Sequence, residues 1–296
     1  MSSYRRRQER AAQLLAAYPH AAEMLGLYRH VVAKQAPLYE WALTADGLAS
    51  GFSPEAGPPS FGDISRGLPV ADLASPFRTF AGELGEDLGE AAPPPLAATA
   101  VALSEAADEV REEVLRHTLE QGSLAAAATS LGSEVAQLAF FARAFLQPLA
   151  EALAVRFPAP PAAFPAEETD GEGPSPRATC PRCGWPPQVA VLRDETEIKG
   201  RRYLVCALCS TWWIFPRTTC PACGETDPKK LPLHQNDATP HLRLEECTTC
   251  KAYLKSVDLR RDGFAVPEVE DLASVELDLW AEERGLWKIS RNLLGM

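Results

Sequence analysis

The chain has 296 residues, enough for two domains of ordinary size, and 46% of them are hydrophobic, enough for a buried core. Its formal net charge of −11 argues against a large nucleic-acid contact surface, which needs an excess of basic residues. The basic cluster Arg5–Arg7 is followed by Gln8, Glu9 and Pro19, so it does not lead into the apolar stretch of an export signal. No uninterrupted apolar run reaches the roughly 20 residues that cross a bilayer, so we expect a cytoplasmic protein with no integral membrane segment.

Residues 1–157 have a helical composition, because Ala, Leu and Glu dominate and β-branched residues are sparse. We expect a first helix up to Tyr18 and a second helix that Pro19 opens and that runs through Trp41. Gly51–Pro69 is rich in glycine and proline, which predicts a long loop.

Three more helices are predicted in this half. A short one covers Phe77–Leu88, and a longer one runs from the prolines at 93–95 to Gln121, where Gly122 ends it. Ser133 indicates the start of the last helix, in which Pro148 should cause a kink or a break. An apolar stripe on this last helix indicates helix-bundle core rather than a cofactor pocket. The stripe consists of Val135, Leu138, Phe141, Phe145 and Leu149.

Residues 158–177 read as a linker, because six prolines, two glycines and four acidic residues fall within positions 157–178. Beyond it, cysteines, β-branched residues and aromatics appear in short strand-like runs. The sequence therefore predicts an α+β protein with an all-α N-terminal domain at 1–157. Two small β-rich modules of the rubredoxin or zinc-ribbon kind follow at 178–218 and 219–265, and a C-terminal helix lies within 266–296.

All eight cysteines fall in four Cys-x-x-Cys pairs within 71 residues. One pair places two sulfurs on a tight turn and supplies half of a tetrahedral site, so the pairs must combine. The first two pairs are separated by 22 residues and the last two by 23, but only 10 residues lie between the middle pairs. This spacing predicts two tandem metal sites, with an interleaved arrangement as the alternative. The first site comprises Cys180, Cys183, Cys206 and Cys209, and the second comprises Cys220, Cys223, Cys247 and Cys250.

Four thiolates suit zinc and equally suit a single iron bound in the rubredoxin manner, so the sequence leaves the choice between iron and zinc open. A closed four-sulfur shell offers no position to a substrate, so the sites are structural or redox centres. A thioredoxin-like redox motif would need a βαβ context, which this sequence lacks. His234 and His241 are expected not to be ligands, because the thiolates complete each shell. The sequence has no Ser-His-Asp arrangement, phosphate-binding glycine loop or His-Glu-x-x-His motif, and we expect no enzymatic activity.

Charge and patterning complete the prediction for this half. Residues 178–262 carry 13 basic and 10 acidic side chains, and two divalent ions with eight thiolates lower their net charge to about −1. Nucleic acid is therefore not expected as a partner, and the aromatics of the modules are expected to fill their cores.

Helical spacing of Leu272, Val275, Leu279 and Trp280 predicts an amphipathic C-terminal helix. The strand candidates are Gln188–Leu192, Arg202–Val205, Trp212–Phe215, His241–Leu244 and Tyr253–Asp258.

The cysteine-rich half resembles a known family, the accessory proteins that bacteria require to form active formate dehydrogenase. The resemblance covers about residues 178–296, and all eight cysteines fall on the family's positions. It rests on Cys180-Pro-Arg-Cys-Gly, Arg202-Tyr-Leu-Val-Cys-Ala-Leu-Cys with Trp212 and Trp213 after it, Cys220-Pro-Ala-Cys, Glu246-Cys-Thr-Thr-Cys-Lys-Ala-Tyr-Leu-Lys255 and Val269-Glu-Asp-Leu-Ala-Ser-Val-Glu-Leu-Asp278.

The resemblance implies a cytoplasmic, iron-binding assembly chaperone. Its partner would be the catalytic subunit of a molybdenum- or tungsten-dependent formate dehydrogenase, before export or membrane attachment of that subunit. We expect the client at the junction of the two halves, against the Gly51–Pro69 loop and exposed aromatics of the modules. The alternatives are a rubredoxin-like electron-transfer or thiol-redox protein and a zinc-ribbon nucleic-acid-binding regulator. Monomer and homodimer both stay open.

Overall fold

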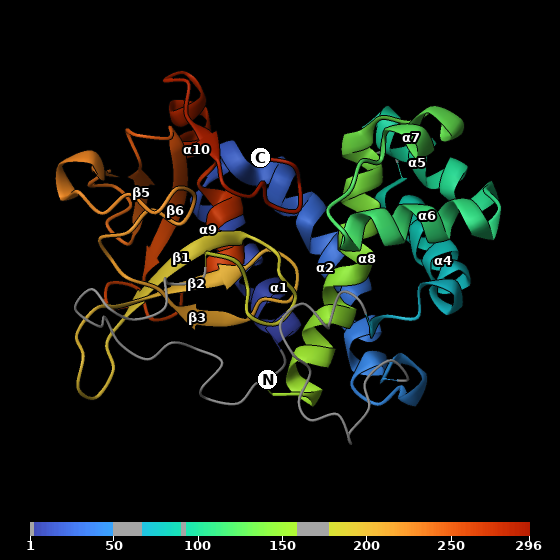
Figure 1. Ribbon diagram of the computed structural model, residues 1–296. Coiled ribbons are helices and arrows are strands. Elements are labelled where there is room, and N and C mark those ends of the chain that lie inside the picture. Colours follow the sequence, from blue (N-terminus) through green and yellow to red (C-terminus); the bar gives the residue numbers. More distant parts are fainter. Residues whose placement is uncertain (1–2, 50–66, 90–92, 159–177) are drawn as a thin grey trace.

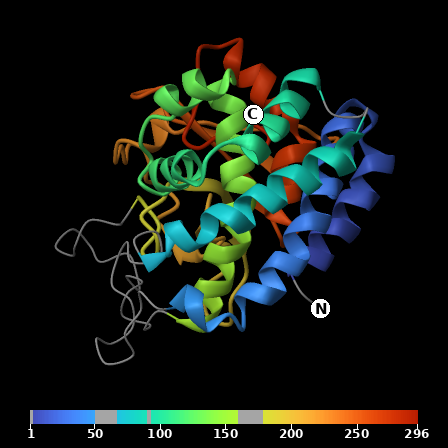
Figure 2. The same ribbon diagram turned by 90° about the vertical axis from the view of Figure 1, so that its right-hand side faces the viewer.

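The computed structural model describes residues 3–49, 67–89, 93–158 and 178–296. Figure 1 shows helices α4 to α8 on one side of the molecule and the β-sheet on the other, with α1 and α2 between them. In Figure 2, which faces the helical side, α2, α4 and α8 lie against one another. The linker at 159–177 and most of the Gly51–Pro69 loop lie outside the described residues.

The described N-terminal half is helical, as predicted. The first two predicted helices are present, and the predicted short helix at 77–88 begins seven residues earlier, at Val70. A helix at 125–131 was not predicted. The helices are α1 (Ser3–Ala17), α2 (Ala22–Ala42), α4 (Val70–Leu88), α5 (Pro94–Glu105), α6 (Asp108–Leu119), α7 (Ala125–Leu131) and α8 (Val135–Arg156), with 3₁₀ turns at Pro19–Ala21 and Asp46–Ala49.

The single long helix predicted from residue 93 to residue 121 is two helices. Ala106 and Ala107 have extended backbones, with ψ of 158° and 154°, and separate α5 from α6. The buried Arg111 occupies this break, where its Nη1 donates to the carbonyls of Leu103 (2.8 Å) and Ala106 (2.6 Å). The guanidinium thus satisfies carbonyls that a helix end leaves unpaired, which favours a turn over a continued helix.

Helix α8 runs unbroken through Pro148, so of the kink or break predicted there, the break is absent. A proline removes the N–H that would bond to the carbonyl four residues earlier, which here is the carbonyl of Ala144. Gln35 of α2 donates from Nε2 to that carbonyl at 2.7 Å, so a neighbouring helix replaces the missing bond. The predicted apolar stripe is core except at Val135, which is exposed. By length and composition α8 could span a membrane, but 72% of that window is buried inside the protein.

The two cysteine-rich segments share one sheet of seven described strands, six of which lie in the order β3-β2-β1-β6-β5-β4. Strands β1 and β6 pair in parallel and join the first segment to the second. Strand β7 pairs with β6 at Ala252–Tyr253, beyond the part of β6 that pairs with β1. All five predicted strands are present, and β4 and β7 were not predicted. The strands are β1 (Pro187–Arg193), β2 (Arg201–Cys206), β3 (Trp212–Ile214), β4 (Leu233–Gln235), β5 (Leu242–Glu246), β6 (Ala252–Asp258) and β7 (Trp287–Lys288).

The predicted C-terminal helix is two short helices, α9 (Pro267–Ala273) and α10 (Val275–Glu282). They meet at Ser274, where the buried Lys255 ammonium donates to the carbonyls of Asp271 (2.5 Å) and Ser274 (3.3 Å). These carbonyls therefore bond to a side chain at the point where the helix is interrupted. Leu272 is buried as the amphipathic pattern predicts, but Leu279 is 49% exposed.

One hydrophobic core runs through both halves. It contains buried residues of α1, α2, α4 and α8 together with the four cysteines of the first predicted site. On the sheet, Ala190 and Leu204 face this core, while Val189 and Val191 belong to a separate cluster on the opposite face. The predicted division into modules at 178–218 and 219–265 stays a prediction, because the sheet is continuous across it.

Candidate metal centres

Each of the four Cys-x-x-Cys pairs forms a backbone turn, and the four turns are of the same kind. In each turn the N–H of the first cysteine donates to the carbonyl five residues later, from Cys180 to Trp185 (2.8 Å), Cys206 to Thr211 (3.0 Å), Cys220 to Glu225 (2.9 Å) and Cys247 to Ala252 (2.9 Å). The residue after the second cysteine has a positive φ in every case. Glycine occupies this position at 184 and 224, but Ser210 (φ 49°) and Lys251 (φ 63°) adopt the same left-handed backbone.

The turns combine into two clusters of four sulfurs, in which the sulfurs lie within 4.8 Å of one another. In the first cluster the Sγ atoms of Cys180 and Cys209 are 3.6 Å apart, and in the second those of Cys223 and Cys247 are 3.7 Å apart. The structure therefore groups the first turn with the second and the third with the fourth, and it does not interleave them. The first cluster is Cys180, Cys183, Cys206 and Cys209, and the second is Cys220, Cys223, Cys247 and Cys250.

The chemistry of both clusters fits one metal ion each. Burial raises the pKa of the Cys183 and Cys206 thiols, so thiolates at these positions need a cation to offset their charge. Backbone N–H groups already point at sulfur, from Leu208 to Cys206 (3.3 Å) and from Ala222 to Cys220 (3.4 Å). Four soft sulfur ligands in a tight group match zinc and iron equally.

The first cluster is enclosed by the helical half. Its four cysteines are at most 3% exposed. The Arg182 guanidinium lies against the cluster and donates to the carbonyls of Ala154 (3.1 Å) and Phe157 at the C-terminal end of α8. Burial lowers the pKa of Arg182, while the nearby cysteine sulfurs oppose that shift. The cluster thus has a buried cation close to its thiolates.

Two further bonds tie the turns of the first cluster to the helices. The indole Nε1 of Trp185 donates to the carbonyl of Leu119 at 3.3 Å. Gln147 of α8 donates to the carbonyl of Ala207 at 3.0 Å and also accepts from Gln35 of α2 at 3.3 Å. Helix α8 therefore bonds directly to the second turn of this cluster, and α2 is connected to it through Gln147.

The second cluster lies at the surface of the sheet. Cys223 is exposed and Cys250 is half-buried. Glu225 bridges its two turns by accepting from the Thr249 hydroxyl (2.6 Å) and from the Lys230 ammonium (3.1 Å). The hydrogen bond from Thr249, with those from Asp227 and Lys230, lowers the pKa of Glu225 to about 2. Local polar contacts, rather than the helical half, hold this cluster.

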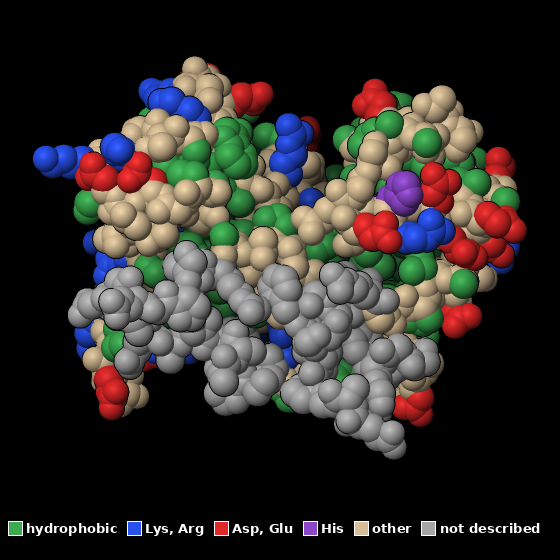
Figure 3. Space-filling model, viewed as in Figure 1, with side chains coloured by type: hydrophobic (Ala, Val, Ile, Leu, Met, Phe, Trp, Pro, Cys, Tyr) green, Lys and Arg blue, Asp and Glu red, His purple; other side chains and the backbone are tan. Residues whose placement is uncertain are grey.

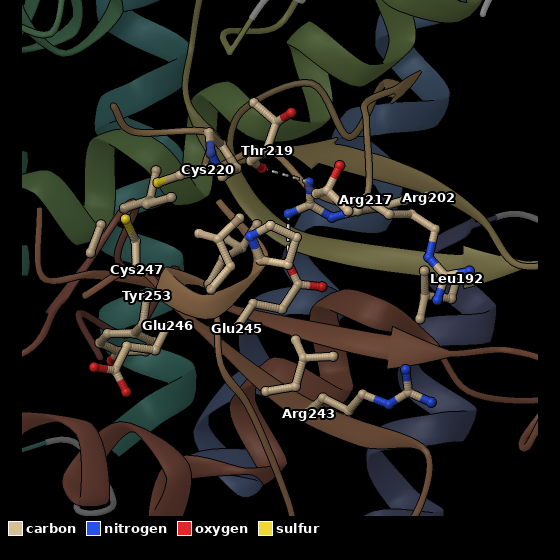
Figure 4. Close-up of a pocket in the computed structure, with 18 residues that line it drawn as sticks. Leu192, Arg202, Arg217, Thr219, Cys220, Arg243, Glu245, Glu246, Cys247 and Tyr253 are labelled. Atoms are coloured by element: carbon tan, nitrogen blue, oxygen red, sulfur yellow. Dashed lines mark hydrogen bonds and ion pairs between the residues drawn. The ribbon is translucent and has the colours of Figure 1, made fainter. Parts of the chain in front are cut away.

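A recess of about 500 Å³ borders the second cluster. Figure 4 shows Cys220 and Cys247 side by side at one end of it, with Arg202, Arg217 and Leu192 at the other. Arg202 is committed to protein partners, because it forms an ion pair with Glu245 at 2.5 Å and donates to backbone carbonyls.

The two histidines expected not to be ligands both have other partners. His234 Nε2 lies 2.8 Å from a Glu246 oxygen, and His241 Nε2 lies 3.2 Å from Glu270. His241, Asp262 and Glu270 lie close enough together to suggest a third metal site. However, Arg10 of α1 forms ion pairs with both carboxylates at 2.6 Å. The arginine supplies the positive charge there, and the group links α1 to the C-terminal half.

Several buried acidic residues of the tail were not anticipated from the sequence. Asp271 and Asp278 are buried and bind two lysines. Lys255 is 2.8 Å from Asp271 and 2.6 Å from Asp278, and Lys288 is 2.8 Å from Asp271 and 3.1 Å from Asp278. These ion pairs join β6, β7, α9 and α10. The acidic tail motif therefore has a structural role, because its buried carboxylates bind these lysines.

A group of buried ion pairs around Arg7 lies at the junction of the two halves. The buried Arg7 of α1 forms ion pairs with Glu151 of α8 and Glu268 of α9, both at 2.9 Å. Ser210, in the second cysteine turn, donates to Glu151 at 2.8 Å. A recess of about 520 Å³ lies beside this group and is lined in part by Trp212 and Cys209.

Comparison with known proteins shows a similarity to one family in the cysteine-rich half. Residues 179–217 match the FdhE central domain and residues 218–294 match the FdhE C-terminal domain. The chain is 41% identical over 116 residues to an FdhE homologue of Aquifex aeolicus and 37% identical over 122 residues to one of Pseudomonas aeruginosa. These matches cover 39% and 40% of this chain and 41% and 40% of the relatives, so the chain matches about two fifths of their length.

A solved structure extends the similarity to the helical half. The crystal structure of the FdhE protein from Pseudomonas aeruginosa superposes with a TM-score of 0.68 and 27% sequence identity. The superposition covers 99% of this chain and 96% of that chain. The similarity in fold thus includes the N-terminal helices, where the sequence resembles the family only in general character.

Proposed function

We propose that this chain, whose residues 179–294 match the FdhE central and C-terminal domains, is a metal-binding accessory protein for the assembly of active formate dehydrogenase. The observation that carries this proposal is the pair of four-cysteine clusters within a fold shared with an FdhE crystal structure. In this function the protein acts as a chaperone on the catalytic subunit of the dehydrogenase, in the cytoplasm, and catalyses no reaction of its own.

The eight cysteines are the metal ligands in this proposal, four to each ion. A bound iron or zinc ion cross-links its two turns and contributes folding free energy, and iron adds a redox couple. The protein's own residues supply the thiolates, the backbone N–H groups that bond to sulfur, and the Arg182 charge beside the first cluster. Both shells are complete with four thiolates, which supports a structural or redox role over hydrolysis.

We place the client at the junction of the two halves. The recess of about 520 Å³ beside Arg7 and Glu151 lies between the helices and the sheet and includes the half-buried Trp212 and the exposed Val155. A partly exposed aromatic beside charged groups is typical of surfaces that bind proteins. The sequence predicted a client surface made of the Gly51–Pro69 loop and exposed aromatics of the modules. Trp212 is an aromatic of this recess, and most of the loop lies outside the described residues.

A deletion and complementation experiment tests the proposal. In a bacterium whose own gene for this chain is deleted, we expect formate dehydrogenase activity to be lost while its catalytic subunit is still synthesised. The chain supplied in trans should restore activity, and its tagged form should capture that catalytic subunit. The matched control is Glu276→Gln, at an exposed carboxylate that pairs with the exposed His20, which should behave as wild type. Normal activity in the deletion strain together with no captured subunit would overturn the proposal.

One specific observation favours a second candidate, an electron-transfer protein. The exposed Cys223 brings one thiolate of the second cluster to the surface, where a redox partner could approach it. Iron-loaded protein whose visible absorbance bleaches reversibly on reduction would support this candidate, and a colourless zinc protein would remove it.

A nucleic-acid-binding regulator has less support. On the face shown in Figure 3, the described residues present separate acidic and basic side chains and no continuous basic patch. We expect negligible nucleic-acid binding at physiological ionic strength, which a salt-dependent binding titration would measure.

A further inference from the structure

We propose that the two cysteine clusters have different tasks: the second is the site where metal exchanges with thiolate ligands from outside, and the first is a permanent lock between the sheet and the helices. This inference deepens the proposed function, since it rests on metal binding by both clusters. It follows from the different surroundings of two sites whose ligands and backbone turns are the same.

The first cluster is closed to incoming ligands. Its cysteines are at most 3% exposed, and they belong to the core that also contains buried residues of α2 and α8. Its turns are bonded to the helical half through Arg182, Trp185 and Ala207. Exposing a sulfur here requires these bonds and the surrounding core to open together, so metal loss is coupled to unfolding.

The second cluster is open. Cys223 and its neighbours Ala222 and Gly224 are exposed, and Cys250 is half-buried. The side-chain bonds around its turns involve residues of the C-terminal half. Glu225 accepts from Thr249 and Lys230, and the half-exposed Trp287 donates from Nε1 to the Cys250 carbonyl at 2.8 Å. A ligand can reach these thiolates without disturbing the core.

The size of the neighbouring recess does not account for the difference. Cys209 of the first cluster borders a recess of about 520 Å³, and Cys220 and Cys247 of the second border one of about 500 Å³. Cys209 is nevertheless 3% exposed, and its sulfur lies 3.1 Å from the Thr211 hydroxyl. The exposure of two cysteine residues of the second cluster, Cys223 and Cys250, therefore distinguishes the two clusters.

The exchange step is a ligand substitution without electron transfer. An incoming thiol gives up its proton as its sulfur binds the ion, and the displaced Cys223 thiolate takes up a proton as it leaves. Repetition at Cys250 and then at the buried pair transfers the ion completely. The ligand class is a thiolate-rich acceptor or donor, in agreement with the soft sulfur character of the site.

The test follows metal release from the full-length protein loaded with two equivalents of zinc. Excess 4-(2-pyridylazo)resorcinol reports free zinc by colour, while iodoacetamide alkylates each cysteine that loses its metal, for assignment by peptide mass spectrometry. We expect one equivalent to leave more than about tenfold faster than the other. The first cysteines alkylated should be Cys220, Cys223, Cys247 and Cys250. Equal release rates, or earlier alkylation of the first cluster, would overturn the inference.

A variant pair strengthens the assignment without removing a ligand. Glu225→Gln weakens the bridge between the turns of the second cluster and should accelerate only the fast phase, whereas Glu276→Gln should change neither phase. An unchanged fast phase in Glu225→Gln would count against the second cluster as its source. The two experiments can fail separately. Equal rates of zinc release together with capture of the dehydrogenase subunit would defeat the inference alone. Unequal rates of zinc release without capture or complementation would defeat the proposed function alone.

Discussion

The first and second cysteine clusters each bring together four cysteines from the same kind of backbone turn, yet one is buried between sheet and helices and the other lies at the surface. One residue reflects the difference in the sequence: Arg182 lies within the first Cys-Pro-Arg-Cys turn, where the matching turn has Ala222. Arg182 reaches the end of α8, while Ala222 is exposed. Identical local motifs can therefore lie in different environments when their long-range contacts differ.

The largest expected effect comes from removing one ligand in each cluster. Cys206→Ser should lower the free energy of unfolding by about 5 kcal/mol or more, because it removes a metal and opens the core shared with the helices. Cys223→Ser should lose its metal with a much smaller loss of helical circular dichroism. Urea unfolding and metal analysis of both variants measure stability and bound metal, and equal losses of stability would contradict the comparison.

On its own, the sequence predicts that a ligand mutation such as Cys183→Ser unfolds the first module and spares the helical half. The shared core instead predicts that the mutation destabilises both.

Arg182→Ala tests the contact that distinguishes the two turns. It removes hydrogen bonds from a charged group to two carbonyls at the end of α8 and should cost about 3 kcal/mol of stability. The reciprocal change Ala222→Arg lies on the surface and should alter stability by less than about 0.5 kcal/mol. Thermal unfolding of the zinc-loaded proteins compares them. A similar small effect in both would show that Arg182 does not secure the first cluster.

Gln35→Leu should weaken the helical support of the first cluster. It leaves the Ala144 carbonyl without its partner opposite Pro148 and should cost about 1–3 kcal/mol. In a Pro148→Ala background the new backbone N–H can bond to that carbonyl, so the same change should cost less. A double-mutant cycle by urea denaturation measures this coupling. Strict additivity would rule out the proposed reason for the unbroken helix.

The smallest effect concerns pH and the buried lysine of the tail. Burial lowers the pKa of Lys288 below its usual value of 10.5, despite the nearby Asp271. Between that lowered value and 10.5 the unfolded chain binds more protons at this position than the folded chain, so the contribution of Lys288 to stability rises with pH. The stability of wild type relative to Lys288→Met should therefore increase between pH 7.5 and about pH 10, in urea unfolding of the loaded protein. A constant difference would contradict the lowered pKa.

The sequence by itself determined the α+β organisation, the five main strands and the grouping of eight cysteines into two sets. These features depend on local spacing: a Cys-x-x-Cys turn closes through hydrogen bonds between residues five apart, and helical composition is a property of short segments. Amphipathic spacing likewise placed Leu138 and Phe145 in the core. The positive φ of Ser210 and Lys251 was not visible in this way, because glycine alone signals such a backbone.

The tertiary structure alone decided where the helices break, how the two cysteine-rich segments join and which cluster is exposed. The first two depend on partners distant in sequence. Gln35 donates to the carbonyl left free by Pro148, Lys255 donates to the carbonyl of Ser274 between α9 and α10, and β1 pairs with β6. Spacing predicts that four sulfurs meet, since that is fixed by turn and hairpin geometry. It does not predict what packs around them, because burial follows from the approach of whole elements, and that approach makes one cluster part of the core and leaves the other at the surface.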